Sequence, residues 1–480
     1  MSKVIDLCVI GAGPAGLAAA ARAAQGGLNV LLLDEQPAAG GQVWRNAGAA
    51  LAGGSMPAAQ AEKAYHGAAA ALRRLAASGV DHRAGATLID IAAPETAPGP
   101  GPEAVVEITW RAPSRAEAPR IRQTAAGAVI CATGAQERPL IFPGAELPGV
   151  MGVGAIQSAY KQSGLVPGGE GVVLAGHGPL LLLTLAQIRA AGGRVAAVLD
   201  LGAPGAMAAV ARTLPRALIG DPALMARGAG LMLRRALSGV PVYRRVTGLR
   251  AHGADSIEAV SFSSAGRATR LPARLLGVHD GVIPNAQVSR LLNLRHVWDA
   301  GQGAFLPVRD TDGAVAPGIW LVGDGAGIGG AEIAAMEGEQ AARAALARAG
   351  RGPDVQGPAA RHLTRRRAAR RLVEALYPPV PMGAYATDDA LICRCETVRV
   401  ADVRAVLGSG IDGPNRVKAM TRCGMGPCQG RLCANPLTRL ISAETGRSPD
   451  AVGALRIRPP LKPVLLMDYL APETMPEVSA

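Results

Sequence analysis

The feature that most constrains this chain is a glycine-rich turn near its start. An apolar run, residues 4–10, leads into Gly11-Ala12-Gly13-Pro14-Ala15-Gly16, and an alanine-rich stretch then extends to about residue 26. Residues 30–33 form a second apolar run that ends at Asp34. In a βαβ unit such glycines allow a tight turn, close approach to a pyrophosphate and close helix–strand packing, and the acid binds a ribose hydroxyl. We therefore expect a dinucleotide to bind at this turn.

A second glycine-rich turn lies in the middle of the chain. Residues 171–175 form an apolar run, followed by Gly176-His177-Gly178-Pro179-Leu180-Leu181, an apolar helical stretch and a run over 195–199 that ends at Asp200. Leu181 stands where a third glycine would let the helix approach its strand. We expect either a helix held away from the strand or an altered or lost nucleotide site. If a nucleotide binds, Asp200 favours an unphosphorylated ribose.

Two further strand ends carry short polar motifs. Residues 128–131 lead into Thr133-Gly134, and residues 318–323 end in Gly323-Asp324 before a helical stretch over 331–347. Alternating strands and helices predict an α/β protein with two Rossmann-like dinucleotide-binding domains. Residues 350–390 are rich in Arg, Pro and Ala and resemble a connector.

Five of the seven cysteines lie between residues 393 and 433. Cys393-Arg394-Cys395 comes first, and the stretch from Cys423 to Cys433 also contains Cys428. Four thiolates can hold a [2Fe-2S] cluster, and glycines between them let backbone N–H groups reach the sulfurs. Zinc is the alternative, although Cys-x-Cys is an unusual opening for a structural zinc site. The other two, Cys8 and Cys131, lie in apolar runs and are expected to be small buried hydrophobic residues.

Composition limits the classes of function. The net charge is +13, but no nucleic-acid-binding motif accompanies it, and the densest basic run, residues 365–371, lies in a helical connector. A surface that docks a partner or attracts anions explains the charge better than nucleic acid does.

The sequence also gives no sign of a membrane span or a leader. No uninterrupted apolar run of eighteen residues occurs, and a nucleotide motif begins by residue 11, so we expect no transmembrane segment, no signal peptide and a cytoplasmic protein. No cysteine pair precedes residue 393 at redox-active spacing, which excludes disulfide exchange. No catalytic triad or metal-hydrolase motif identifies catalytic residues.

These motifs together resemble the two-dinucleotide-domain flavoproteins of the glutathione and thioredoxin reductase superfamily. The stretches 34–42, 133–139, 142–144 and 147–150 look like those of the α subunits of bacterial opine oxidases, hydroxyproline dehydrogenases and hydrogen cyanide synthase, and sarcosine oxidase α subunits share part of this pattern. Leu181 is usual in that group. Residues 388–450 resemble the bacterioferritin-associated-ferredoxin-like [2Fe-2S] domain.

The resemblance implies a domain plan and a set of site residues. It implies a split FAD-binding domain over 1–150 and 285–348, an inserted NAD(P)-type domain over 151–284, a linker over 349–387, a small α-rich [2Fe-2S] domain over 388–450 and a Pro-rich tail over 451–480. In it, Cys428 and Cys433 complete the cluster with Cys393 and Cys395, and Cys423 is left as the spare. A strand-like run over 416–420 is expected just before Cys423. The residues expected to bind FAD are Gly11, Gly13, Pro14, Ala15, Gly16, Asp34, Glu35, Gly41, Gln42, Thr133, Gly134, Gly323 and Asp324.

The resemblance also implies a function. The chain would be the electron-transfer flavoprotein subunit of a heteromeric enzyme that oxidises the C–N bond of an amino acid, imino acid or opine. An amino-acid-oxidase-like β subunit would oxidise the substrate, with room for an FMN at the subunit interface and for a small ferredoxin-like γ subunit. Two alternatives remain open at this point: a self-sufficient NAD(P)H-dependent flavin reductase that feeds the cluster, and a non-catalytic scaffold that holds an adenine nucleotide. The sequence names neither the substrate nor the final electron acceptor.

Overall fold

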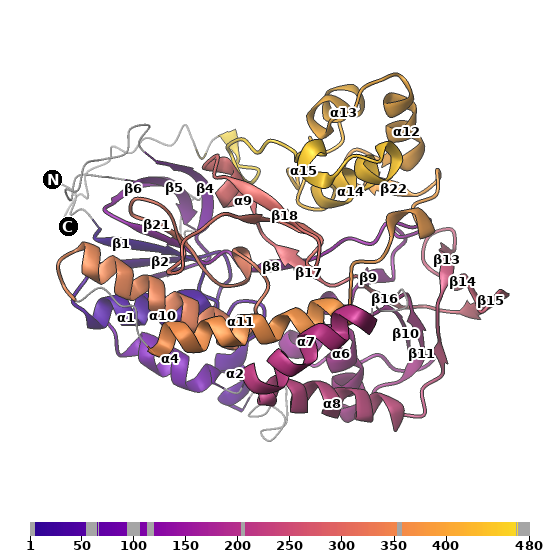
Figure 1. Cartoon of the computed structure of the whole chain (residues 1–480), viewed down its shortest axis with the longest axis horizontal. Coiled ribbons are helices and arrows are strands. Elements are labelled where there is room, and N and C mark those ends of the chain that lie inside the picture. The colour runs from indigo at the N-terminus through magenta and orange to yellow at the C-terminus, as the bar shows by residue number, and fades with distance from the viewer. Residues whose placement is uncertain are drawn as a thin grey trace, which may run out of the picture.

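Two mainly parallel sheets form the body of the molecule, and a small helical module lies on top of them (Figure 1). The computed structural model describes residues 5–53, 65, 67–93, 106–112, 120–202, 207–352, 358–466 and 468. The first sheet has the order β20-β21-β7-β1-β2-β3 and is parallel except for the pairing of β20 with β21. Its strands are β1 (Leu7–Ile10), β2 (Val30–Asp34), β3 (Asp81–Ala84), β7 (Val129–Cys131), β20 (Ala314–Ala316) and β21 (Ile319–Leu321).

Alternate side chains of the first sheet pack into two different cores. Leu7 and Val9 of β1 pack with helix residues such as Leu17 and Ala341, whereas Cys8 and Ile10 pack against an antiparallel sheet on the other face. A strand that is buried on both faces in this way has an unbroken apolar sequence. The covering elements are α1 (Pro14–Gln25), α2 (Ala47–Leu51), α4 (Ala68–Ala76) and α10 (Ala331–Arg348) on one side, and β4 (Thr87–Ala92), β5 (Val106–Ala112) and β6 (Arg120–Ala126) on the other.

The second sheet is parallel throughout, in the order β12-β11-β10-β16-β9. Leu174 of β10 packs with Ile156 and Leu185 of the covering helices, and Val173 packs with Phe262 of an antiparallel sheet. The strands are β9 (Val150–Gly152), β10 (Val172–Gly176), β11 (Val195–Asp200), β12 (Val242–Tyr243) and β16 (Leu276–His279). Around them lie α5 (Val153–Ser163), α6 (Pro179–Ala190), α7 (Met207–Gly220), α8 (Pro222–Ala236), β13 (Thr247–His252), β14 (Ala259–Ser264) and β15 (Arg267–Pro272).

The chain crosses between the two sheets at one paired junction. Strand β8 (Ala135–Glu137) leads out of the first sheet, and β17 (Val282–Pro284) leads back antiparallel to it. The return continues through α9 (Gln287–Leu291), β18 (His296–Asp299) and β19 (Ala304–Pro307) before β20, β21 and the short helix η1 (Gly323–Gly325).

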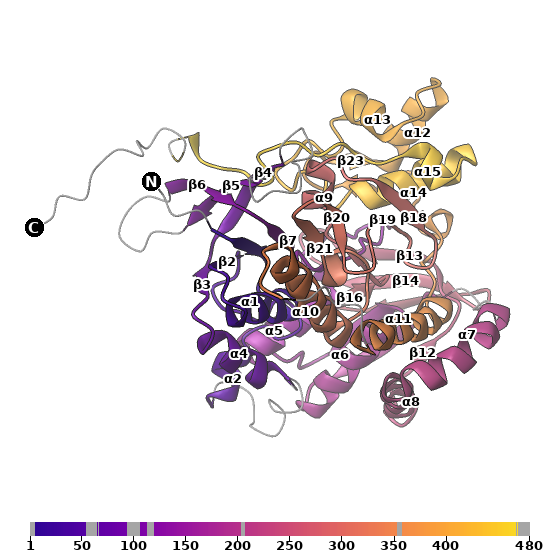
Figure 2. The same cartoon turned by 60° about the vertical axis from the view of Figure 1, so that its left-hand side comes forward.

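The C-terminal part begins with a long helix, α11 (Pro358–Leu376), which packs on α7 through Ala217, Ala369 and Leu372. A module with its own core follows, in which Val403, Val417 and Leu437 are fully buried. Figure 2 shows this module above α9 and β18. Its elements are η2 (Met382–Ala384), β22 (Leu391–Cys393), β23 (Val398–Arg399), α12 (Val400–Gly408), α13 (Pro414–Thr421), α14 (Ala434–Thr445) and α15 (Pro449–Val452).

One local prediction is wrong: residues 416–420 belong to helix α13 and not to a strand. The alternation of charged and apolar residues in this run imitates a half-buried strand. The helix begins at Pro414 after Gly413, which is a favourable pair for a helix start. Val417 is buried whereas Ala419, two residues later, is exposed, so the two alternate apolar residues do not share a buried face as they would in a half-buried strand.

Candidate functional site

The first glycine turn has the backbone that a nucleotide site requires. Gly11 has a φ of 103°, and a Cβ atom there would lie 2.4 Å from the Ala132 carbonyl oxygen. A Cβ atom on Gly16 would lie 1.7 Å from the Gly11 carbonyl oxygen, so the first turn of α1 can approach β1 only without a side chain. Gly13 is the N-cap of α1 and Pro14 is its first residue. The free N–H groups of this helix end therefore face the space beyond the strand ends, where they can bind phosphate.

Asp34 and the loop that follows it lie beside this turn. The Asp34 carboxylate accepts hydrogen bonds from the N–H of Ala12 and, at 2.6 Å, from the N–H of Gln36. Burial raises the pKa of Asp34, although these N–H donors act in the opposite direction. A Cβ atom on Gly41 would lie 2.8 Å from the Gly13 Cα, so the loop touches the glycine turn.

Three other predicted residues of this region have defined places. Gln42 accepts a hydrogen bond from Arg45 at 2.7 Å. Glu35 is exposed and forms an ion pair with Lys462, which comes from the C-terminal segment. Ala15, in the first turn of α1, is buried against η1, since a Cβ atom on Gly323 would lie 2.9 Å from the Ala15 Cβ.

Asp324 is held at the end of β21 by the start of α10. One oxygen, Oδ1, accepts from the N–H groups of Gly329 and Gly330, each at 2.8 Å. Burial raises the pKa of Asp324 against the effect of these donors. Among the described residues the second oxygen, Oδ2, has no hydrogen-bond donor. Asp324 is only partly buried, so this oxygen can accept from a group that the chain itself does not supply.

Thr133 and Gly134 complete this edge of the sheet. Thr133 Oγ1 donates to the Asn285 carbonyl at 3.0 Å, and Asn285 N–H donates to the Gly134 carbonyl at 2.9 Å. A Cβ atom on Gly134 or on Gly330 would meet no atom within 4 Å. The backbone is thus open at each of these glycines, at the carboxyl ends of the parallel strands, where nucleotides bind in such sheets.

The second glycine turn is covered by the chain itself. The His177 ring meets the Tyr377 ring edge-on at 5.9 Å, and Tyr377 comes from the segment after α11. Leu181 is 2% exposed and lies in the apolar core beneath α6. The bulky side chain at the third position is therefore absorbed by packing between helix and sheet.

A buried charge cluster, missed by the sequence reasoning, lies beside this turn. Asp280 is fully buried, and its carboxylate lies 3.3 Å from Arg138 Nη1, 3.1 Å from Arg439 Nη1 and 3.9 Å from His177 Nε2. It also accepts from the Val380 N–H at 2.8 Å. Burial alone would raise the pKa of Asp280, but these neighbours lower it to about 2. The sequence offered no signal for this cluster, because its residues come from five distant segments.

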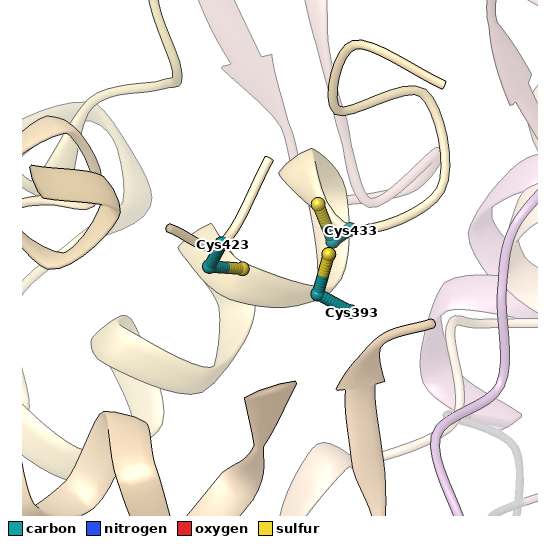
Figure 3. A group of neighbouring side chains, drawn as sticks. All are labelled: Cys393, Cys423 and Cys433. Atoms are coloured by element: carbon teal, nitrogen blue, oxygen red, sulfur yellow. The ribbon is translucent and has the colours of Figure 1, made fainter. Parts of the chain in front are cut away.

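The five clustered cysteines form two groups. The sulfurs of Cys393, Cys423 and Cys433 all lie within 4.8 Å of one another, and all three residues are buried (Figure 3). Cys395 is exposed and Cys428 is half-buried, and these two thiols hydrogen-bond to each other. The sequence predicts Cys423 as the spare cysteine, and the structure brings it into the buried group.

Electrostatics distinguish the thiols. Hydrogen bonds from Cys423 and Cys433 lower the pKa of Cys393, and the same hydrogen bonds raise the pKa of Cys423 and Cys433, so these contacts do not choose between the last two. Cys433 is the N-cap of α14, whereas Cys423 follows the C-terminus of α13. A helix N-terminus favours a thiolate and a C-terminus disfavours it. By contrast Cys8 and Cys131 lie in the first sheet, where burial raises the pKa of both, and they are the buried hydrophobic residues that the sequence predicts.

Comparison with known families covers nearly the whole chain. Residues 5–347 match the family model described as pyridine nucleotide-disulphide oxidoreductase, and residues 388–472 match that of the sarcosine oxidase A3 domain. Among the described residues, no helix is both long and apolar enough to cross a membrane.

Individual relatives agree with these matches. The A subunit of opine oxidase from Rhizobium meliloti (strain 1021) is 40% identical over 96% of this chain and 97% of its own length. The HcnB subunit of hydrogen cyanide synthase from Pseudomonas aeruginosa is 32% identical over 95% of this chain and 96% of its own length. The alpha subunit of sarcosine oxidase from Corynebacterium sp. (strain P-1) is 28% identical over 96% of this chain but only 44% of its own length. The crystal structure of L-proline dehydrogenase from P. horikoshii superposes with a TM-score of 0.69 over 97% of this chain and 79% of that chain, at 18% identity, which shows a shared fold.

Proposed function

Because this chain belongs to the pyridine nucleotide-disulphide oxidoreductase family, and within it is homologous to opine oxidase A subunits, we propose that it is the electron-transfer flavoprotein subunit of a heteromeric C–N-oxidising enzyme. The substrate class would be an amino acid, imino acid or opine. Relatives named as subunits of opine oxidase, hydrogen cyanide synthase and sarcosine oxidase support this choice.

One observation carries the proposal. The chain packs a five-cysteine module onto the edge of the first sheet where the nucleotide-site residues gather. The Gln136 amide, three residues after Thr133, donates to the Arg431 carbonyl at 2.5 Å. A protein that only held a nucleotide would not need thiols at this edge.

The residues at the first sheet fit FAD. The N-terminus of α1 would bind its pyrophosphate, Asp34 its adenosine ribose, and Asp324 its ribityl chain through the carboxylate oxygen that lacks a donor. When bound, a flavin accepts two electrons as hydride and releases them singly, and an iron–sulfur cluster accepts them one at a time. The protein supplies orientation: Thr133 and Asn285 lock the two backbones that flank the open space at Gly134.

The thiols fit a [2Fe-2S] cluster. We assign its ligands to Cys393 and Cys433 from the buried group and to the pair Cys395 and Cys428, which gives two thiolates for each iron. Cys433 is preferred to Cys423 because it lies at the N-terminus of a helix.

The residues that contact the substrate would lie on a partner. We propose that this partner is an amino-acid-oxidase-like β subunit, with an interfacial FMN and a small ferredoxin-like γ subunit completing the assembly. This chain would then receive electrons and pass them on, which explains why it has no recognisable set of catalytic residues among the described side chains.

The test is co-purification with the products of neighbouring genes, followed by analysis of flavin, iron and acid-labile sulfide. We expect one FAD and two irons per chain, and oxidation of an opine or imino acid with an artificial acceptor only when the β subunit is present. A colourless chain would overturn the proposal in favour of a scaffold. Substrate oxidation by the chain without any partner would overturn the division of labour.

A further inference from the structure

The loop between Cys428 and Cys433 is fixed to the nucleotide-binding domain by two glutamine side chains. Gln136 Nε2 donates to the Arg431 carbonyl at 2.5 Å, and Gln287 Nε2 donates to the Gln429 carbonyl at 3.2 Å. Gln136 lies in β8 and Gln287 begins α9, so both belong to the junction where the chain crosses between the two sheets.

The same junction forms the edge of the proposed flavin site. Gln136 follows Gly134 by two residues, and Gln287 follows Asn285 by two residues. Asn285 is hydrogen-bonded to both Thr133 and Gly134. The two glutamines therefore connect the backbone that borders the open space at Gly134 directly to the backbone between two proposed cluster ligands.

The loop needs such support because part of its backbone is strained. Gln429 has a φ of 51°, which is unfavourable for a residue with a side chain, and Gly430 follows with a φ of 77°. The Gln429 carbonyl is the group that Gln287 binds. Strained residues persist where the surroundings determine them, and they gather at functional sites.

We propose that Gln136 and Gln287 are positioning residues that hold the Cys428–Cys433 loop against the flavin edge, so that electrons pass from flavin to cluster inside one chain. This inference rests on the proposed function. With both groups bound, the flavin would supply electrons one at a time and the cluster would accept them, while the flavin proton would leave to solvent. The glutamines take no part in the chemistry, and their amides only fix the loop.

The test uses the holoprotein with Gln136→Met, Gln287→Met and the double variant, because methionine keeps the length of the side chain and removes the donor. Gln340→Met is the matched control, since Gln340 Nε2 also donates to a backbone carbonyl, that of Thr311, at 3.2 Å, on the outer side of the same domain. FAD, iron and sulfide contents are measured first. The flavin is then reduced by a light flash, and the appearance of the reduced cluster is followed by absorbance and by EPR.

We expect the single variants to keep both cofactors and to slow cluster reduction about fivefold each, and the double variant about twentyfold, because each hydrogen bond favours the docked loop by a factor of about five. The midpoint potential of the cluster should also shift, which a role in stability alone would not produce. Gln340→Met should behave as wild type. If the double variant loses iron, the rate of cluster reduction and the midpoint potential of the two single variants test the inference instead. If the variants keep both cofactors and show the wild-type rate of cluster reduction and the wild-type midpoint potential, the inference is overturned. A wild type without flavin or iron would overturn the proposed function instead.

Discussion

At the scale of single residues, the two acidic residues at strand ends have different partners and different consequences. Asp34 uses both oxygens on backbone N–H groups, whereas Asp324 uses Oδ1 alone. Each Asp34 oxygen already accepts one N–H and the residue is buried, whereas Asp324 is only partly buried and offers an oxygen without a donor. We therefore expect the contribution of Asp324 to flavin binding to be the larger one.

The first prediction compares these two acids. Asp324→Ala should raise the dissociation constant for FAD about 10- to 100-fold, as expected for a charged acceptor worth roughly 1–3 kcal/mol, and Asp34→Ala should raise it less. The dissociation constant is measured by fluorescence titration of the apoprotein. Asp310→Ala is the control, since Asp310 is exposed in the same domain. Stoichiometric FAD in both site variants after dialysis would refute the assignment.

The second prediction concerns the competition between Cys423 and Cys433. Both are buried beside Cys393, so proximity alone does not choose between them. Cys433→Ser should abolish the EPR signal of the reduced cluster, as should serine at Cys393, Cys395 or Cys428, whereas Cys423→Ser should retain iron and sulfide. Iron lost from Cys423→Ser and kept in Cys433→Ser would show that the wrong thiol was assigned. Zinc in the anaerobically purified wild type would exclude the cluster altogether.

At the scale of elements, the segment after α11 covers the second glycine turn. Tyr377 packs edge-on against His177, and the backbone of Val380 binds the buried Asp280. In a functional nicotinamide site this turn would instead face the pyrophosphate. We infer that the glycine turn of the inserted domain serves to pack against the segment after α11.

The third prediction follows from this covered turn. NADH or NADPH mixed with the holoprotein should reduce the flavin slowly or not at all. Stopped-flow absorbance near the flavin band measures the rate, and photoreduction of the same sample is the control that the flavin is reducible. Rapid bleaching by either nucleotide would support the self-sufficient reductase.

The elements were predictable where local sequence determines them. The first βαβ unit was predictable from the sequence, because unbroken apolar strands, a glycine turn and a terminal acid specify it without distant contacts. The helix α13 was not predictable in this way, because its charged and apolar residues alternate as in a strand, and only tertiary packing shows that Val417 faces the core while Ala419 does not. The contact of Gln287 with Gln429 was equally inaccessible, since 142 residues separate the two and nothing local marks either.

At the scale of the whole molecule, Asp280 joins parts that are far apart in sequence. Arg138 follows β8, His177 lies in the second glycine turn, Val380 lies in the connector and Arg439 lies in α14 of the cysteine module. The charge cluster therefore links both sheets to the module that carries the thiols. A buried charge that loses its partner is costly, so this site should set the stability of the whole arrangement.

The last prediction tests this role of Asp280. Asp280→Asn leaves Arg138 and Arg439 buried without a counter-charge and should lower the free energy of unfolding by about 3–5 kcal/mol. Asp389→Asn is the control: Asp389 pairs with Arg250 at 2.6 Å, but both are more than 40% exposed, so the loss should stay below about 1 kcal/mol. Denaturant titration measures the free energy of unfolding of both variants.

The pH dependence of stability gives a second check. Because the folded pKa of Asp280 is lowered to about 2, its stabilisation is complete above the unfolded pKa of about 4 and disappears as the pH falls through 2. The gap between wild type and Asp280→Asn should therefore be constant from pH 7 to about 5 and narrow below about 4. Equal losses in the two variants, or a gap that widens on acidification, would show that the buried cluster does not hold the domains together.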